Sequence, residues 1–142
     1  MGNISSLNNK TNIKAVILKK LNKEEFKKNF LIDNKGQENV IYFSESNAKF
    51  INSVAPFGFF KSEDEAIDIL MDTLRDNVDA VAEWLLSGKT VLVINHTFNK
   101  EIGFIFDENE KPVSTTDVAL FLNRSENSEV GFYVKNFTPN KK

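Results

Sequence analysis

The spacing of apolar residues changes at Gly88, and this change constrains the fold more than any other feature of the sequence. Before Gly88, the apolar positions from Ile67 to Leu86 follow one another by three and four residues, which predicts helix. After Gly88, apolar residues alternate, which predicts strands over 90–95, 102–106, 117–123 and 130–137. We therefore expect an α+β fold in which N-terminal helices pack on a curved, C-terminal antiparallel sheet of about four strands.

Local signals set the ends of these helices. Ser62 followed by Glu65 is a capping box, so a helix is expected to begin there. Asp76-Asn77 is expected to break the helical stretch in two, with Asp76 capping the second helix, which Gly88 ends. Trp84 lies at the edge of the apolar stripe, and we expect it to be largely buried between helix and sheet.

The elements expected over residues 1–60 depend on weaker sequence signals. Residues 1–12 are polar and are expected to form a disordered arm, ahead of a single domain over 13–142. Residues 13–18 are expected to form a short strand or an apolar anchor, and Asn22 to cap a short helix over 23–31. We further expect a turn at 33–37, a strand at 40–43, a helical turn at 44–53 and a tight apolar connection at 55–60.

Composition excludes several classes of protein. A chain of 142 residues, of which 41% are hydrophobic, has the length of one domain and enough apolar side chains for a hydrophobic core. It has no cysteine and one histidine, which excludes disulfides, thiolate catalysis and any metal site that needs several imidazoles or thiolates. We expect no metal and no cofactor. No apolar run is long enough to cross a membrane, and no signal-peptide core is evident, so a cytoplasmic location is expected.

Charge is distributed unevenly along the chain. Residues 1–35 hold eight lysines and three acidic residues, whereas residues 36–142 hold ten basic and seventeen acidic residues. A basic run falls partly on one face of the expected helix at 23–31, and it would either bind phosphates or form a solvated face. This run consists of Lys19, Lys20, Lys23, Lys27 and Lys28. The excess of acidic residues over 36–142 is atypical of proteins that bind duplex nucleic acid tightly.

Three further features admit a functional and a structural interpretation. His96 follows the first expected strand, where an imidazole could carry protons or simply end the strand. The acids at 63–65 are accounted for by a helix start. The 13 phenylalanines could stack on bases, but alternate positions in strands are more typical of a core.

From Pro56 to Pro139 the order of features resembles one protein family. The features are Pro56–Phe60, the capped helix start at 62–66, Asn77…Val81…Trp84-Leu85 before Gly88, Ile102-Gly103, Val118–Leu122, and Gly131–Val134 running to Pro139. This order resembles the bacterial RNase A-like toxin domain, found at the C-termini of contact-dependent inhibition proteins and other secreted polymorphic toxins.

The resemblance implies a metal-independent ribonuclease that cuts RNA through the 2′-oxygen, but two family features are missing. Upstream of Pro56 there is neither the family's histidine nor its arginine, and the family's terminal Thr-x-Tyr-Pro is replaced by 136–139, Asn-Phe-Thr-Pro. The remaining candidates for proton transfer are His96, Tyr133 and Thr138. Candidates for binding the phosphate with a positive charge are Lys49, Lys61 and Lys135.

Whether the chain is an enzyme is left open at this point. If active, it is a ribonuclease delivered into a target-cell cytoplasm, with RNA as substrate and a cognate immunity protein as partner. The alternatives are a catalytically inactive relative that binds RNA or protein, and an immunity or interaction protein. The acidic charge of residues 36–142 favours these alternatives.

Overall fold

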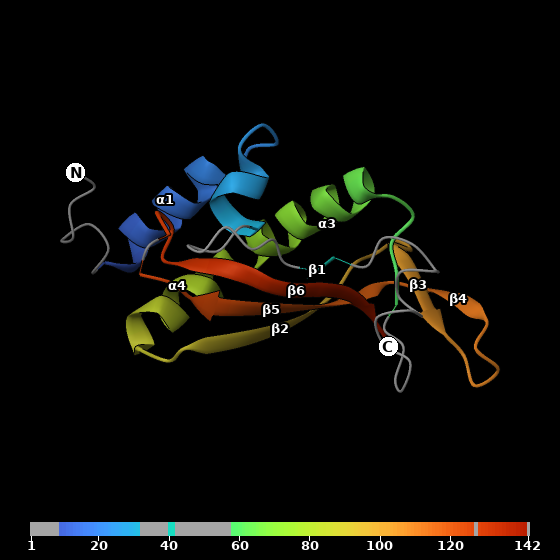
Figure 1. Ribbon diagram of the computed structural model, residues 1–142. Helices are drawn as coiled ribbons and strands as arrows, with labels where there is room; N and C mark the ends of the chain where they lie inside the picture. The colour runs from blue at the N-terminus through green and yellow to red at the C-terminus, as the bar shows by residue number, and fades with distance from the viewer. Residues whose placement is uncertain (1–8, 32–39, 42–57, 127, 142) are drawn as a thin grey trace. The chain divides into compact units, whose positions relative to one another are not determined.

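The computed structural model describes residues 9–31, 40–41, 58–126 and 128–141. Helices come first and a C-terminal antiparallel sheet follows, which confirms the α+β class (Figure 1). The chain divides into two compact units. The first comprises residues 1–39, 71–92 and 121–135, and the second comprises 40–70, 93–120 and 136–142. Each unit is described below by itself.

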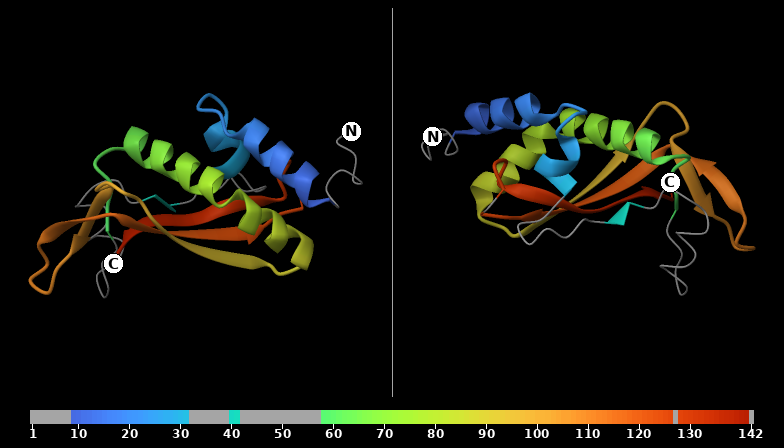
Figure 2. Two further views of the ribbon diagram at one scale, coloured as in Figure 1. Left: turned by 180° about the vertical axis from the view of Figure 1, so that it is seen from behind. Right: turned by 45° about the horizontal axis from the view of Figure 1, so that its top comes forward.

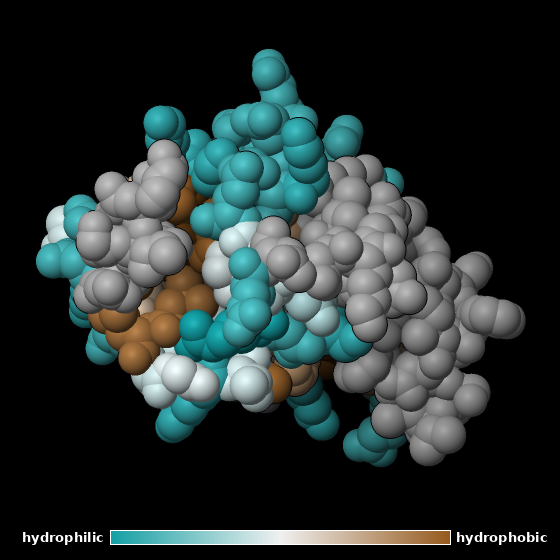
Figure 3. Space-filling view, turned by 60° about the vertical axis from the view of Figure 1, so that its left-hand side comes forward, coloured by the Kyte–Doolittle hydropathy of each residue, from teal (hydrophilic) through white to brown (hydrophobic). Residues whose placement is uncertain are grey.

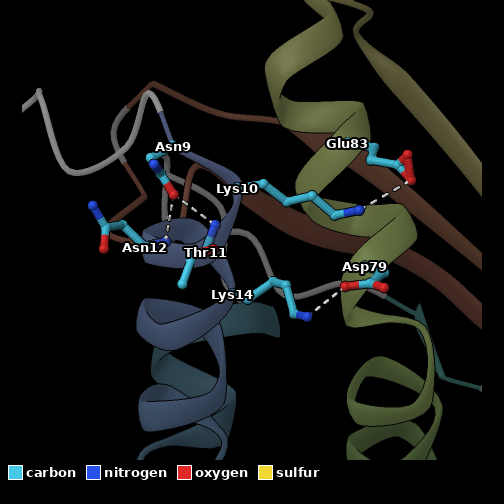
Figure 4. Close-up of polar contacts among 7 residues, drawn as sticks. All are labelled: Asn9, Lys10, Thr11, Asn12, Lys14, Asp79 and Glu83. Atoms are coloured by element: carbon cyan, nitrogen blue, oxygen red, sulfur yellow. Dashed lines mark hydrogen bonds and ion pairs between the residues drawn. The ribbon is translucent and has the colours of Figure 1, made fainter.

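The first element, α1 (Lys10–Lys20), is a helix, so the strand or anchor expected at 13–18 is wrong. Helix α1 also takes in residues 10–12, which were expected in the arm; residues 1–8 lie outside the described residues. Asn9 is the reason the helix begins here, because its side-chain oxygen accepts hydrogen bonds from the Thr11 and Asn12 amides (Figure 4). Ile13 and Ile17, one turn apart, are its buried side chains.

A short π-helical turn, η2 (Lys27–Leu31), follows α1 in the first unit. The expected cap is present, since the Asn22 side chain accepts a hydrogen bond from the Glu25 amide at 3.0 Å. Phe26 and Phe30 are fully buried and their rings stack at 5.0 Å. The turn therefore serves to bring two large apolar rings into the core.

Helix α3 (Glu63–Asp76) begins as the capping box predicts, because the Ser62 hydroxyl accepts a hydrogen bond from the Glu65 amide. Helix α4 (Val78–Ser87) follows after a one-residue break. The residue at its N-terminal boundary is Asn77 and not Asp76, and the Asn77 side chain donates to the Thr73 carbonyl instead of capping α4. Gly88 ends α4 with a φ of 80°, a left-handed conformation that favours glycine.

The core of the first unit is aromatic. Phe132, at the start of β6 (Phe132–Asn140), lies 5.7 Å from the Phe30 ring and 6.0 Å from the Trp84 ring. Trp84 is 4% exposed, which confirms its predicted burial. Helices α1 and α4 lie side by side in this unit (Figures 1 and 2).

Two ion pairs join α1 to α4. Lys14 Nζ lies 2.6 Å from Asp79 Oδ1, and Lys10 Nζ lies 3.5 Å from Glu83 Oε1 (Figure 4). The four-residue spacing on both helices places the two pairs one above the other. A third pair, Lys20 with Glu129 at 2.6 Å, fixes the far end of α1 within the same unit.

The main sheet has the strand order β1-β6-β5-β2. Its members are β1 (Val40–Ile41), β2 (Val91–Thr97), β5 (Asp117–Arg124) and β6. β1 pairs with β6 in parallel, whereas β2 and β5 are antiparallel, joined at their ends by Phe98 N to Thr116 O and Arg124 N to Thr90 O. The predicted strands at 90–95, 117–123 and 130–137 are thus confirmed with shifted ends. The strand expected at 40–43 is confirmed at 40–41, and the expectations for 33–37, 42–43, 44–53 and 55–57 lie outside the described residues.

A two-stranded hairpin in the second unit was only half predicted. It pairs β3 (Gly103–Phe106), which was expected, with β4 (Pro112–Thr115), which falls in a segment expected to be a loop (Figures 1 and 2). Pro112, Val113 and Ser114 are exposed and only Thr115 is buried. Such a strand shows no apolar alternation, so its sequence carries no signal for it.

Two glycines, Gly58 and Gly103, allow the hairpin to lie close to the backbone at Phe59 and to Pro139 in the second unit. Phe59 forms an isolated bridge with Phe104, in which each amide donates to the other's carbonyl at 2.9 Å. A Cβ at Gly103 would lie 2.8 Å from the Phe59 carbonyl oxygen and 2.8 Å from the Pro139 ring, and one at Gly58 would meet the Phe104 carbonyl oxygen. Only glycine permits this contact between backbones.

Candidate functional site

His96 lies near the end of β2 in the second unit. Ile94, two residues before it, is buried, and His96 itself is half-buried, so both side chains lie on the same side of the strand. Its ring contacts Phe98 edge to face at a centroid distance of 4.7 Å. The imidazole is therefore held in place and still partly accessible, which are the conditions that a proton carrier needs.

Thr138, a second candidate for proton transfer, is 3% exposed. Its hydroxyl lies 3.4 Å from the Gly58 carbonyl oxygen and 3.1 Å from the Pro139 carbonyl oxygen, to which it donates. A hydroxyl buried and engaged in this way holds the segment around Gly58 against β6. Thr138 thus has a structural role within the second unit, and its burial leaves little access for a substrate.

Lys61 lies two residues before α3 and lines a pocket of about 280 Å³ that lies entirely in the second unit. The other lining residues are Glu65, Asp68, Ile69, Lys100, Glu101 and Ile102. Ile69 and Ile102 are buried and form an apolar floor, while the charged side chains are exposed. Lys61 was expected to supply charge to phosphate, whereas Lys100 and the acidic members were not expected in a site, because they have no motif spacing.

Acidic residues outnumber basic ones around this pocket and across the whole second unit. Its described residues include four basic and nine acidic side chains, whereas those of the first unit include eleven basic and eight acidic side chains. The two lysines of the pocket therefore lie in an acidic setting. A free phosphate would find attraction from Lys61 and Lys100 and repulsion from Glu65, Asp68 and Glu101.

Tyr133 and Lys135 lie on β6 in the first unit, two residues apart and therefore on one face of the strand. Tyr133 is half-buried, and its hydroxyl oxygen accepts a hydrogen bond from the Asn123 side chain at 3.3 Å. Lys135 is exposed. The structure thus places these two candidates together in one unit, and His96, Thr138 and Lys61 in the other; Lys49 lies outside the described residues.

A cluster of three half-buried phenylalanines also lies in the second unit. The Phe59 ring stacks on Phe104 at 5.1 Å with an interplanar angle of 22°, and lies 5.6 Å from Phe106. Phe104 and Phe106 are two residues apart on β3 and share one face of the hairpin. The alternation in β3 was visible in the sequence, but the partner ring, Phe59, comes from a distant segment that no local pattern could indicate.

Within residues 9–31, 40–41, 58–126 and 128–141, no three His, Asp or Glu side chains gather where they could hold a metal ion. Over the same residues, no helix has the length and apolar character that crossing a membrane requires. Apolar atoms do reach the surface locally (Figure 3). The exposed large apolar side chains among the described residues are Leu18, Leu86, Val91, Val93 and Val113.

Comparison with known proteins gives one informative likeness. No family model matches the sequence, and no curated protein matches it. Among solved structures, the fold matches a chain in the crystal structure of the CdiA-CT/CdiI complex from Y. kristensenii 33638, with a TM-score of 0.59. The two chains are 18% identical, and the match covers 71% of this chain and 94% of the other. At this identity the likeness shows a shared α+β fold.

Proposed function

We propose that this chain is a toxin-type domain of a contact-dependent inhibition system, that it has the RNase A-like fold, and that its substrate is RNA. The observation that carries the proposal is the fold likeness to a chain of a CdiA-CT/CdiI complex. The order of sequence features from Pro56 to Pro139, which resembles the RNase A-like toxin domain, supports the proposal separately. In such a system the domain acts in the cytoplasm of a target cell and has a cognate immunity protein as partner.

The proposed reaction is cleavage through the 2′-oxygen without a metal ion. Neutral His96 takes the proton of the ribose 2′-hydroxyl, the 2′-oxygen bonds to the adjacent phosphorus, and the bond from phosphorus to the 5′-oxygen breaks. Lys61 supplies positive charge for the phosphorane oxygens. The departing 5′-oxygen takes its proton from water, since the family's second acid–base group has no counterpart here. General acid catalysis contributes about 10²–10⁴-fold, so the reaction should be slow.

Tyr133 and Lys135 are proposed as a second RNA contact, in the first unit. A phenol ring and an ammonium on the same face of one strand suit a base and a phosphate of a single strand. The first unit is also the one with an excess of basic residues. This contact would raise affinity and leave the bond-breaking step to His96.

A second candidate function is that of an inactive relative that binds a protein. Two observations favour it: the Thr138 hydroxyl is buried and engaged, and the second unit carries nine acidic against four basic described residues. An acidic unit repels RNA, whereas it attracts a basic protein surface. Cleavage and RNA binding would both be absent if this function were the correct one.

The experiment is incubation of micromolar, EDTA-treated protein with total RNA. We expect slow cleavage that persists in EDTA and is lost in His96→Ala. Thr97→Ala is the matched control, because Thr97 is the exposed neighbour of His96 on the opposite side of β2. Tyr133→Phe should weaken RNA binding while leaving the saturated rate unchanged. Cleavage that survives His96→Ala would contradict the assignment of the base, and cleavage that EDTA abolishes would contradict the mechanism.

A further inference from the structure

The second unit carries a surface that shares only Lys61 with the proposed reaction. It consists of the Phe59, Phe104 and Phe106 rings together with the pocket beside Lys61, and we call it the hairpin surface. The bridge between Phe59 and Phe104 ties its two parts together, because Lys61 is two residues from Phe59, and Ile102 two residues from Phe104. Three large rings that are only half-buried leave apolar area that a partner could cover.

The shape of the pocket suits a single long side chain. Its volume of about 280 Å³ lies just below the roughly 300–1,000 Å³ of pockets that hold drug-sized ligands. Buried Ile69 and Ile102 offer an apolar floor for a methylene stem, and Glu65 and Glu101 offer carboxylates for a charged head. Lys61 and Lys100 also line the pocket. They would repel a second positive charge placed close to the first one in the bound segment.

Charge decides which occupant fits. We propose that the hairpin surface binds an extended segment of a partner protein that carries arginine. Guanidinium groups lie favourably over aromatic faces, and a neighbouring arginine can enter the acidic pocket. Beyond β3, the hairpin loop adds Asp107, Glu108 and Glu110, and this loop's only basic residue is Lys111. RNA would stack its bases on the same rings but would bring its phosphates against these carboxylates.

The acidic side chains also argue against a second copy of this chain as the occupant. A second hairpin surface would oppose like charges, which disfavours a symmetric contact between two copies. The inference uses neither His96 nor Tyr133, and Lys61 is the one residue that it shares with the proposed reaction. The aromatic rings and acidic side chains that carry it are the same in an active toxin domain and in an inactive binding relative.

The test uses a synthetic twelve-residue peptide in which arginine alternates with serine and glycine, titrated into ¹⁵N-labelled full-length chain and followed by NMR. We expect shifts confined to residues 58–69 and 100–111, and weaker binding at higher salt. Phe104→Leu, which keeps apolar volume but removes the ring face, should weaken binding about threefold. Glu65→Gln with Glu101→Gln should weaken it by a similar factor.

The controls decide between occupants. Phe121→Leu, a half-buried phenylalanine of the first unit, should leave binding unchanged. A peptide with glutamate in place of arginine should not bind, and a uridine octamer should not shift the three phenylalanines of this surface. The inference is overturned if the glutamate peptide binds equally, if Phe104→Leu changes nothing, if the octamer shifts Phe59, Phe104 and Phe106, or if the chain alone self-associates through this surface.

Discussion

The two units use their polar and aromatic side chains in opposite ways. In the first unit the rings of Phe30, Phe132 and Trp84 are buried against one another, and Lys10, Lys14 and Lys20 each pair with an acid of the same unit. In the second unit the Phe59, Phe104 and Phe106 rings are half-buried, and acids outnumber bases by nine to four among its described residues. The rings and these lysines of the first unit thus contact groups of the same unit, whereas the three rings of the second unit stay partly accessible.

The largest expected effect comes from opening the aromatic core of the first unit. Phe132 is fully buried between the Phe30 and Trp84 rings, so Phe132→Ala should lower the free energy of unfolding by about 3–5 kcal/mol. Phe104→Ala removes a half-buried ring and should cost clearly less. Denaturant titration of both variants measures the difference, and equal losses would show that the two aromatic clusters are equally structural.

A smaller loss is expected where the hairpin approaches Phe59. Gly103→Ala would place a Cβ 2.8 Å from the Phe59 carbonyl oxygen and the Pro139 ring, and such overpacking costs about 1–3 kcal/mol. Gly88→Ala is the contrasting variant, because its Cβ would meet nothing within 4 Å and only the φ of 80° opposes it. Amide exchange should show faster opening of β3 in Gly103→Ala but not in Gly88→Ala; unchanged exchange would mean that the bridge is not a close contact.

The next effect concerns the end of α4, where Arg124 donates several hydrogen bonds to backbone carbonyls. Arg124 donates to the carbonyl oxygens of Trp84, Leu85 and Lys89 at 2.9–3.0 Å, and its guanidinium lies 5.5 Å from the Trp84 ring centroid. Arg124→Met keeps the stem but loses these donors, and should cost about 1–2 kcal/mol. Arg75→Met, which loses one exposed pair with Asp72, should change the thermal midpoint little, and an equal shift would contradict this role of Arg124.

The smallest effect is electrostatic and depends on pH. The hydrogen bond from Lys14 lowers the pKa of Asp79, and the one from Lys20 lowers the pKa of Glu129. A carboxyl whose pKa is lowered in the folded state stabilises above its ordinary pKa and loses that contribution as the pH falls through the lowered value. The thermal midpoint should therefore drop below about pH 4, less steeply in Asp79→Asn. Identical profiles for the two proteins would show that this pair contributes nothing.

The sequence predicted the elements whose signals are local. The capping box at Ser62, the left-handed glycine at 88 and the alternation in β2, β3, β5 and β6 are all confirmed, because each depends on residues close in the chain. Helix α1 was missed because its apolar run also fits a strand, and the cap at Asn9 lies within the polar arm. β4 was missed because its side chains are mostly exposed.

The candidate site was harder to predict than the fold. His96 and Lys61 were selected by residue type, but the neighbours of Lys61 come from another segment: Lys100 and Glu101 reach the pocket beside the bridge between Phe59 and Phe104. Thr138 was selected for its hydroxyl, but that hydroxyl is buried and donates a hydrogen bond to the Pro139 carbonyl oxygen. Long-range pairing of this kind leaves no trace in one sequence.

One measurement tests the proposed function most directly: incubation in EDTA with a DNA oligomer that contains a single ribonucleotide. Cleavage through a 2′-oxygen predicts one cut, on the 3′ side of the ribonucleotide, which leaves a 2′,3′-cyclic phosphate and a free 5′-hydroxyl. An all-DNA oligomer should remain intact, and His96→Ala should leave both intact. Cuts elsewhere, or a 5′-phosphate product, would contradict the mechanism, and no cut at all would contradict the ribonuclease proposal.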